Sequence, residues 1–426
     1  EEEGREAEDK ISKKALLEKL EPMELVQKYT NMYHWAMRAF NNIEPGIEPT
    51  ATGHIVEQIT MTQKIIDAGY AYEVNSSVYF DVEKYNHDFS AIGKPYGMLS
   101  GRILEDMLET TRSLDNQDEK RNKADFALWK KAPPAHLMRW ASPWGDGFPG
   151  WHIECSAMAT KYLGDEFDIH GGGMDLQFPH HECEIAQSTV CNHKTPARYW
   201  IHNNMITING KKMGKSYNNV IKLSELFTGN HPALTQAYGP MVIRFFILQT
   251  HYRSTLDFSN DALIAASRGL KRLWETMDNL KLIDTTHGAG TDEELEKKVH
   301  GLLHEMEGYM NDDFNTAKVL ANIFELVPVI NGVKDKHIAA NALSGKTIEI
   351  LKQKLQVWLV DIFGLKQEDE SSDGKLDGVL QLLISIRRDA RGRKDFMTSD
   401  KIRNELQQLG IQLKDEKDGG ISYSFL

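Results

Sequence analysis

The sequence predicts an α/β protein in which a sheet-containing part with an insertion is followed by an all-α helical bundle and a small carboxy-terminal α+β domain. Within residues 142–219, short apolar segments typical of strands alternate with glycine-rich stretches and helical patterns. From Asp261 onward, apolar residues recur with a helical period almost throughout. An acidic segment without periodicity, residues 367–374, then precedes a basic tail, and we predict a flexible linker there.

Two helices, a hairpin and a strand are predicted before the central stretch. Residues 23–40 and 52–68 carry apolar side chains at helical spacing. Residues 69–82, GYAYEVNSSVYFDV, alternate polar and apolar side chains around an Asn-Ser-Ser centre, which predicts a β-hairpin. Residues 84–122 are polar, so we predict loops there that end in one helix, and the ADFALWK segment predicts a further strand.

The central stretch, residues 142–219, contains most of the residues with distinctive chemistry. A Gly/Pro-rich loop leads into WHIEC, which precedes the helix-like SAMATKYLG, and FDIHGG predicts a short buried strand that runs into a glycine turn. FPHHECEIAQS predicts a helix with Pro179 in its first turn, where a missing N–H costs nothing. WIHNNMITI predicts another strand, and the following Asn209-Gly210 pair predicts a tight turn.

Three side chains of this stretch form a candidate metal site. His180 and Glu184 are four residues apart, so they share one face of the predicted helix. With Cys155 they would supply imidazole, carboxylate and thiolate, all good zinc ligands, and three protein ligands plus an open position is the usual catalytic arrangement. Cys183 is a rival ligand, and His181 is expected to face substrate or support the ligands. The alternative is a buried thiol beside a helix-surface ion pair.

A glycine turn and a lysine loop are candidates for binding phosphate and ribose. The turn, Gly171 to Gly173, follows the predicted strand and precedes Asp175. Glycine lets backbone approach a ligand closely, and an acid at such a strand end can bind a ribose hydroxyl. Lys212 and Lys215 lie on a small-residue loop, where they could neutralise phosphate charge. The loop lacks the spacing of a P-loop, and similar stretches are common on protein surfaces.

Composition limits the classes of protein that fit. A chain of 426 residues is long enough for several domains, and it has no apolar run that approaches the length of a membrane span. Three cysteines without framework spacing indicate a reducing compartment. A net charge of −12 excludes wholesale electrostatic binding of nucleic acid, so such a partner would need a local basic patch. The tail has one, although a solvated helix face would look similar: Arg387, Arg388, Arg391, Arg393 and Lys394.

Helices dominate the rest of the chain. Four segments with apolar residues at helical spacing predict the bundle, which could equally be a scaffold without a ligand: residues 262–282, 292–310, 316–333 and 347–363. Asn315 or Thr316 is placed to cap the third helix. The tail predicts two helices, residues 379–388 and 398–409, followed by a short hairpin.

Several of these motifs together resemble one enzyme family. The KMGKS loop resembles the KMSKS loop of class I aminoacyl-tRNA synthetases, with glycine in place of the first serine. GWHIECSAM, DIHGGGMDLQFPHHECEIAQS and HYRSTLDFS resemble segments of the cysteinyl-tRNA synthetases, in the same order, and the resemblance runs over essentially the whole chain. It implies a class I Rossmann-like nucleotide-binding sheet and an AMP-forming ligase that uses ATP to activate L-cysteine and transfers it to tRNA(Cys).

The resemblance also implies roles for individual residues. The family holds one zinc ion with two Cys, one His and one Glu, and Cys155, His180 and Glu184 match three of these positions. The metal then takes the sulfur of the substrate cysteine, which separates it from serine by coordination, not by fit. Further implied roles concern the pocket wall (Trp151, His170 and His181), ATP with Mg²⁺ (Lys215 with Lys212 in support) and the tRNA (the five basic residues of the tail). Gly171, Gly172, Gly173 and Asp175 remain the other candidates for binding ATP.

The same resemblance implies an order of domains along the chain. They are the remainder of the first half of the catalytic domain with helices (residues 1–71), a connecting insertion (72–141), the second half of the catalytic domain with the zinc site and KMGKS loop (142–219), a stem-contact region (220–260), the helical bundle (261–366) and an anticodon-binding domain (375–426). We expect a cytoplasmic monomer without membrane contact.

One departure from the family leaves alternatives open. The family's first catalytic segment, with its His-x-Gly-His motif and the fourth zinc ligand, has no counterpart; TGHIVEQ at Thr52 is the nearest string, in the wrong context. The sequence begins at Glu1 instead of methionine, so we expect it to start inside a longer natural protein. The alternatives are an inactive paralogue or fragment that binds tRNA or zinc, and a cysteine ligase with a small-molecule acceptor.

Overall fold

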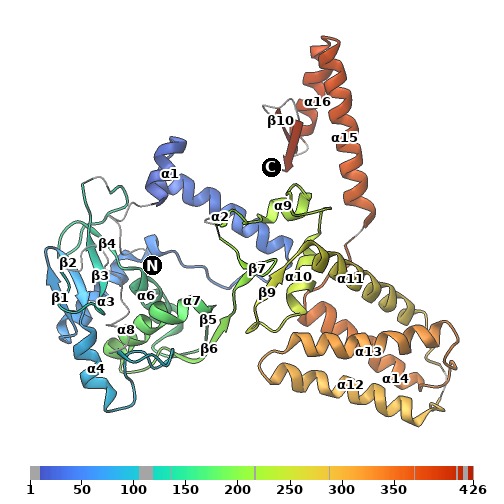
Figure 1. Ribbon diagram of the computed structural model, residues 1–426, viewed down its shortest axis with the longest axis horizontal. Helices are drawn as coiled ribbons and strands as arrows, with labels where there is room; N and C mark the ends of the chain where they lie inside the picture. Colours follow the sequence, from blue (N-terminus) through green and yellow to red (C-terminus); the bar gives the residue numbers. More distant parts are fainter. Residues whose placement is uncertain are drawn as a thin grey trace. The chain divides into compact units, whose positions relative to one another are not determined.

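The computed structural model describes residues 10–104, 119–134, 136–214, 217–286, 288–368, 370–408, 411–415 and 421–425. The chain divides into two compact units, residues 1–365 and residues 366–426, and each is described by itself. Figure 1 labels most of the helices and strands of both units.

The first unit begins with helices, which are α1 (Lys10–Glu18), α2 (Pro22–Ala39), η1 (Ala51–His54) and α3 (Ile55–Asp67). Proline at the first position of α2 needs no N–H partner, and the Glu24 carboxylate accepts from the Glu21 N–H at 2.8 Å. The helix predicted at residues 23–40 forms as α2, within one residue of its expected limits, and the helix predicted at residues 52–68 forms as η1 and α3 in succession.

An antiparallel four-stranded sheet follows, in the order β1-β2-β3-β4 (Figure 1). Its strands are β1 (Ala71–Val74), β2 (Ser77–Phe80), β3 (Phe126–Lys131) and β4 (Gly147–Pro149). Asn75 and Ser76 take positive φ angles of 51° and 67° and form the turn of the predicted hairpin. The loop prediction for residues 84–122 is wrong at its start, because α4 (Val82–Ser90) forms there, capped by Asp81. The helix predicted near residues 103–112 falls almost wholly outside the described residues.

The central stretch forms a β-α-β unit. Helix α6 (Trp151–Leu163) leads to β5 (Phe167–Gly173), and the short α7 (Met174–Leu176), η3 (Gln177–His181) and α8 (Glu182–Asn192) connect it to β6 (Ala197–Asn203). Strands β5 and β6 are parallel. Two predictions are corrected here. The glycines belong to the strand instead of a turn, each pairing with β6, and β5 is not fully buried, since Ile169 is 53% exposed.

The predicted strand WIHNNMITI is two strands. After β6 ends, Asn204 bonds locally to the Met205 N–H, and β7 (Ile206–Ile208) joins a different sheet in the order β8-β7-β9. In that sheet β8 (Lys211–Lys212) is antiparallel to β7, and β9 (Leu256–Phe258) is parallel to it. Helices α9 (Leu223–Thr228) and α10 (Pro240–Leu248) lie between β8 and β9 in sequence.

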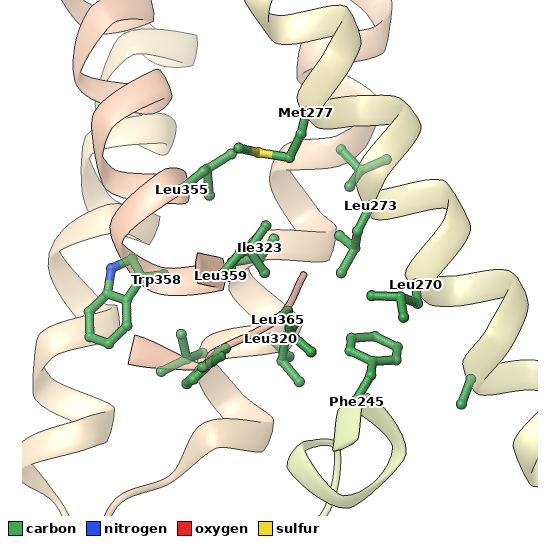
Figure 2. Packing of buried hydrophobic residues seen from close by; sticks show 14 of the residues in the cluster. Phe245, Leu270, Leu273, Met277, Leu320, Ile323, Leu355, Trp358, Leu359 and Leu365 are labelled. Carbon is green, nitrogen blue, oxygen red and sulfur yellow. The ribbon is translucent and has the colours of Figure 1, made fainter. Parts of the chain in front are cut away.

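A helical bundle completes the first unit, as predicted. It contains α11 (Asn260–Lys281), α12 (Glu293–Asn311), α13 (Thr316–Lys334) and α14 (Gly345–Gln356), which continues into η5 (Val357–Ile362). Asn315 caps α13 through a bond from the Lys318 N–H at 3.2 Å. Figure 2 shows Leu273 and Met277 pointing into the same core as Leu355 and Leu359.

Helix α13 is the one helix of the described residues that is long and apolar enough to cross a membrane, but half of the relevant window is buried inside the bundle. A core helix of a bundle has the same composition. Its buried residues, among them Ile323, Leu326 and Ile330, follow the predicted helical spacing.

The second unit holds α15 (Glu370–Gly392), α16 (Phe396–Gln408) and an antiparallel hairpin of β10 (Ile411–Asp415) and β11 (Ile421–Phe425). Leu380, Leu406 and Ile411 form its core. The predicted linker at residues 367–374 is largely wrong, because α15 already begins at Glu370. Glutamate is a good helix former, and the absence of apolar periodicity over one or two turns does not exclude a helix.

Candidate functional site

The three predicted ligands converge at one point, where His180 and Glu184 are buried and Cys155 is half-buried. Cys155 comes from α6, while His180 and Glu184 lie one helical turn apart at the junction of η3 and α8. Their ligand atoms all lie within 4.8 Å of one another. Phe178 precedes a proline and has an extended backbone, with φ −137° and ψ 132°. Helical geometry therefore begins after Phe178, and His180 and Glu184 lie on the same helical face. Pro179 therefore lies close to the helix start, as predicted.

One buried oxygen of this cluster has no hydrogen-bond partner among the described residues. Glu184 Oε1 lies 3.0 Å from His180 Nε2, yet it is buried and makes no hydrogen bond among the residues that the structure describes. Burial, and next the charges of Glu184 and Glu154, raise the pKa of the Cys155 thiol to about 12. Burial also raises the pKa of Glu154 to about 7. A cation placed among these groups would satisfy the orphaned oxygen and favour the thiolate.

Histidines surround the cluster. His152 Nδ1 lies 2.8 Å from His180 Nδ1, so the second nitrogen of His180 is held by a neighbouring ring. His170 Nε2 lies 3.5 Å from Glu184 Oε2. Such contacts on the far side of a ligand fix its ring orientation.

His181 and His170 form, with Glu184, a second group whose ligand atoms also lie within 4.8 Å of one another. His181 Nδ1 is 2.8 Å from His202 Nε2. Burial, and next the other histidines, lower the pKa of His181 to about 3, and burial lowers the pKa of His170 and His202. These rings therefore stay neutral near pH 7, the form in which imidazole binds metals or accepts hydrogen bonds.

Cys183, the rival ligand, faces a different environment. Its sulfur lies 3.3 Å from the Tyr96 hydroxyl and is fully buried in the hydrophobic cluster that contains Phe126 and Ile153. An offset of three residues from His180 places it on a neighbouring strip of the helix.

Two tryptophans border the histidines. Trp151 is 54% exposed and its ring centroid lies 4.3 Å from that of His180, so it covers the cluster instead of filling a core. The ring centroid of Trp200, on β6, lies 4.6 Å from that of His170 and 5.0 Å from that of His181. Trp200 and His202 were not singled out from the sequence, although their alternation on one strand was a usable signal.

Two of the three glycines of β5, Gly172 and Gly173, are required by their neighbours. A Cβ on Gly172 would lie 2.8 Å from the His181 ring, and one on Gly173 would lie 2.4 Å from Asp175 Oδ1. Gly171 has open space apart from a backbone oxygen of Ile201 at 3.8 Å. The glycines thus let the strand pass close to His181 and leave Asp175 exposed at its end.

The lysine loop begins at a tight hairpin. Asn209 and Gly210 have φ angles of 49° and 74°, which is the pattern of a type I′ turn and matches the predicted Asn-Gly turn. Lys212 ends β8 with its side chain exposed. Lys215 lies outside the described residues.

A loop of the insertion is tied to the start of α8. The buried Glu182 carboxylate accepts from the N–H groups of Gly97, Leu99 and Ser100 at 3.1, 2.8 and 2.7 Å, and from the Ser100 hydroxyl at 2.9 Å. Burial raises the pKa of Glu182, and the bonds from Ser100 oppose that rise. The side chain of Gln177 bonds to the Leu99 carbonyl from the same segment. Sequence reasoning missed Glu182, because its partners are more than 80 residues away.

The basic patch of the tail is smaller than predicted. Arg387 is only 1% exposed, because it lies on the α15 face that also buries Leu380 and Ile384, so it is corrected from a surface residue to a core residue. Arg388, Arg391, Arg393 and Lys394 are exposed at or just after the end of α15.

The sequence matches two family models. Residues 5–268 match "tRNA synthetases class I (C) catalytic domain" and residues 305–367 match "DALR domain". A cysteine–tRNA ligase of Bacteroides thetaiotaomicron is 57% identical over 97% of this chain and 82% of its own length. The chain belongs to the cysteine–tRNA ligase family. A more distant member, from Chlorobaculum tepidum, is 44% identical over 97% of this chain and 81% of its own.

Membership of the cysteine–tRNA ligases confirms the predicted fold class, enzyme class and function. The protein is an aminoacyl-tRNA ligase whose substrates are an amino acid, ATP and tRNA. Among solved structures, a methionyl-tRNA synthetase of Mycobacterium tuberculosis with methionyl-adenylate aligns with a TM-score of 0.58 at 13% identity, covering 88% of this chain and 84% of that one. That likeness supports the class I fold alone.

Proposed function

We propose that the Cys155, His180 and Glu184 cluster holds the Zn²⁺ with which this cysteine–tRNA ligase selects its amino acid. The observation that carries the proposal is the convergence of a thiol, an imidazole and a carboxylate within 4.8 Å around a buried Glu184 oxygen that lacks a hydrogen bond among the described residues. This N, O and S donor set suits zinc. When bound, zinc supplies a position for the substrate sulfur and lowers the pKa of that thiol.

The protein groups around the cluster would then orient the ligands and exclude water. His152 holds His180, and His170 contacts Glu184. Trp151 lies over the cluster on the exposed side and would form the pocket wall. Serine has a hard, weakly acidic hydroxyl, so coordination separates it from cysteine more strongly than a difference in fit, which is limited to about 1–3 kcal/mol.

Adenylate formation is assigned to the lysine loop and the end of β5. Lys212 and Lys215 would stabilise the phosphate charge of ATP and Mg²⁺ during attack by the cysteine carboxylate. Gly171 to Gly173 would let the nucleotide approach the backbone, and Asp175 would bind its ribose. The exposed position of Asp175 and the open space at Gly171 support this assignment.

The exposed basic residues of the tail are assigned to tRNA. They are Arg388, Arg391, Arg393 and Lys394; Arg387 is excluded from direct contact by its burial. Arginine suits this role because its fork matches phosphate and base edges. The three cysteines carry reduced thiols, which supports a cytoplasmic location.

The test is zinc content and cysteine-dependent ATP–pyrophosphate exchange of Cys155→Ser, with Cys191→Ser as the matched control. Cys191 has a thiol whose pKa burial also raises to about 12, but its sulfur contacts the Met61 carbonyl, away from the cluster. Cys155→Ser should lose zinc and exchange together, while Cys191→Ser keeps both. Zinc retained equally in both variants would remove Cys155 from the ligand set.

A further inference from the structure

The hairpin that opens the lysine loop is held by a carboxylate from outside it. Asp257 lies on β9, and its Oδ1 accepts from the Thr207 hydroxyl at 2.6 Å and from the Gly210 N–H at 2.7 Å. Gly210 is the second residue of the type I′ turn, and Thr207 lies on β7 just before that turn. One oxygen therefore ties the strand and the turn to a third segment that is about 50 residues away in sequence.

The pairing places Asp257 in line with a loop lysine. Thr207 pairs with Asp257 on one side and with Lys212 on the other, so the three residues form one row across β9, β7 and β8. Directly opposed residues point to the same face of a sheet and interact with one another. Displacing Thr207 would consequently shift the backbone from which Lys212 projects.

A second side chain fixes the base of the same loop. The Asn219 amide accepts from the Gly214 N–H at 2.9 Å and donates to the Lys212 carbonyl at 3.1 Å. It therefore joins the carboxy-terminal side of the loop, at Asn219, to the amino-terminal side, at Lys212 and Gly214. Asp257 at the turn and Asn219 at the base together hold the backbone around Lys212, while the Lys212 side chain stays exposed.

We propose that Asp257 is a positioning residue that orients Lys212 for phosphate stabilisation through the Thr207 hydroxyl and the Gly210 amide, with Asn219 completing the clamp. This rests on the proposed function of the lysine loop. Asp257 itself is not a catalytic residue, because it acts on the loop backbone. Its effect must therefore disappear when the lysine that it positions is removed.

The test is a double-mutant cycle in the full chain between Asp257→Ala and Lys212→Ala, read as the kcat/KM for ATP in cysteine-dependent pyrophosphate exchange. Misplacing a group by about 1 Å can cost roughly 10²-fold, so Asp257→Ala should lower this value by about 10- to 100-fold. In the Lys212→Ala background the further loss should be under about threefold, since coupled residues are not additive. Asp257→Asn, which keeps an oxygen acceptor, should restore most of the activity.

The matched control is Asp292→Ala, which removes a carboxylate that caps α12 through the Leu295 N–H at 3.0 Å, far along the chain from the loop. It should leave kcat/KM for ATP near wild type. Equal losses for Asp257→Ala and Asp292→Ala, or the same loss for Asp257→Ala with and without Lys212, would overturn the proposal.

A measurement that does not depend on enzyme activity separates this proposal from the proposed function on which it rests. Tryptic cleavage after Lys211 and Lys212 should be several-fold faster in Asp257→Ala and in Thr207→Val than in Asp292→Ala. A loss of exchange in Lys212→Ala no larger than that in Asp292→Ala would count against the proposed role of the loop, whereas unchanged cleavage in both clamp variants would count against the clamp alone.

Discussion

Replacing Glu182 with alanine removes the carboxylate that ties the loop of residues 97–100 to the start of α8. Four donors lose their acceptor, and three of them are backbone N–H groups. An unsatisfied buried donor costs about 1–3 kcal/mol. Gly97 is buried, so its N–H would stay unsatisfied, whereas Leu99 and Ser100 are half-buried and can reach water.

The net cost follows from these opposing terms. Burying a charged carboxylate costs free energy, and this cost is the reason why the pKa of Glu182 is raised. Alanine avoids that cost, which offsets part of the stability lost with the hydrogen bonds. We expect Glu182→Ala to lower the free energy of unfolding of the first unit by about 2–4 kcal/mol, and Glu182→Gln, which keeps one acceptor oxygen, by roughly half as much.

Urea unfolding followed by tryptophan fluorescence would measure this change, and tryptic cleavage after Arg102 would report whether the loop is released. Glu83→Ala is the control, because that exposed carboxylate accepts a bond from the Asn122 amide at 3.2 Å and takes no part in holding the loop of residues 97–100. A Glu182→Ala variant as stable as Glu83→Ala, with the loop still protected, would refute the reasoning.

Three other changes have predictable outcomes. Gly172→Ala should push the His181 ring away from the strand and raise the KM for cysteine, because its Cβ would lie 2.8 Å from that ring; Gly171→Ala, with nothing closer than 3.8 Å, should have a smaller effect, and equal effects would contradict the clash. Leu359→Ala should lower the free energy of unfolding by about 2–5 kcal/mol, since the side chain is fully buried in the bundle; a loss below about 1 kcal/mol would mean that the bundle collapses around the cavity. The Arg253 guanidinium, and next the Tyr252 hydroxyl, lower the pKa of Asp313 below 3.8, so its stabilisation is complete above about pH 4 and is lost as the pH falls through the lower folded value. Acid titration of stability in Asp313→Asn should lack that component, which is at most about 1 kcal/mol at this partly exposed site, and an unchanged profile would exclude it.

Short-range patterns predicted the parts of the site that lie on one element. The His180 and Glu184 spacing, the Asn-Gly turn and the hairpin at Asn75 all depend on neighbours within four residues, and the structure contains each of them. The break between β6 and β7 was not visible, because the strand ends only when Asn204 bonds to Met205 and to the Arg253 carbonyl.

The features that the sequence did not predict depend on packing between residues far apart in the chain. Arg387 looks like the other arginines of its helix in sequence, and only the contacts of α15 with α16 and β10 determine that it faces the core. Glu182 and Asp257 have partners about 80 and 50 residues away, so no local window indicates that one holds a loop and the other a hairpin. The direction in which Cys183 points was likewise fixed by Tyr96.

The proposed sites for amino-acid selection and for ATP use are held in place in different ways, because the two steps make different demands on the protein. In the proposed function, discrimination by coordination needs ligand atoms at fixed positions. His180 and Glu184 are buried, a neighbouring ring lies against His180, and the Glu182 clamp lies at the start of the same helix. Phosphate charge moves during adenylate formation, and Lys212 is held through its backbone while its charged end stays in solvent. Substitutions in the cluster should therefore change which amino acid is used, whereas substitutions in the clamp of the lysine loop should change how well ATP is used.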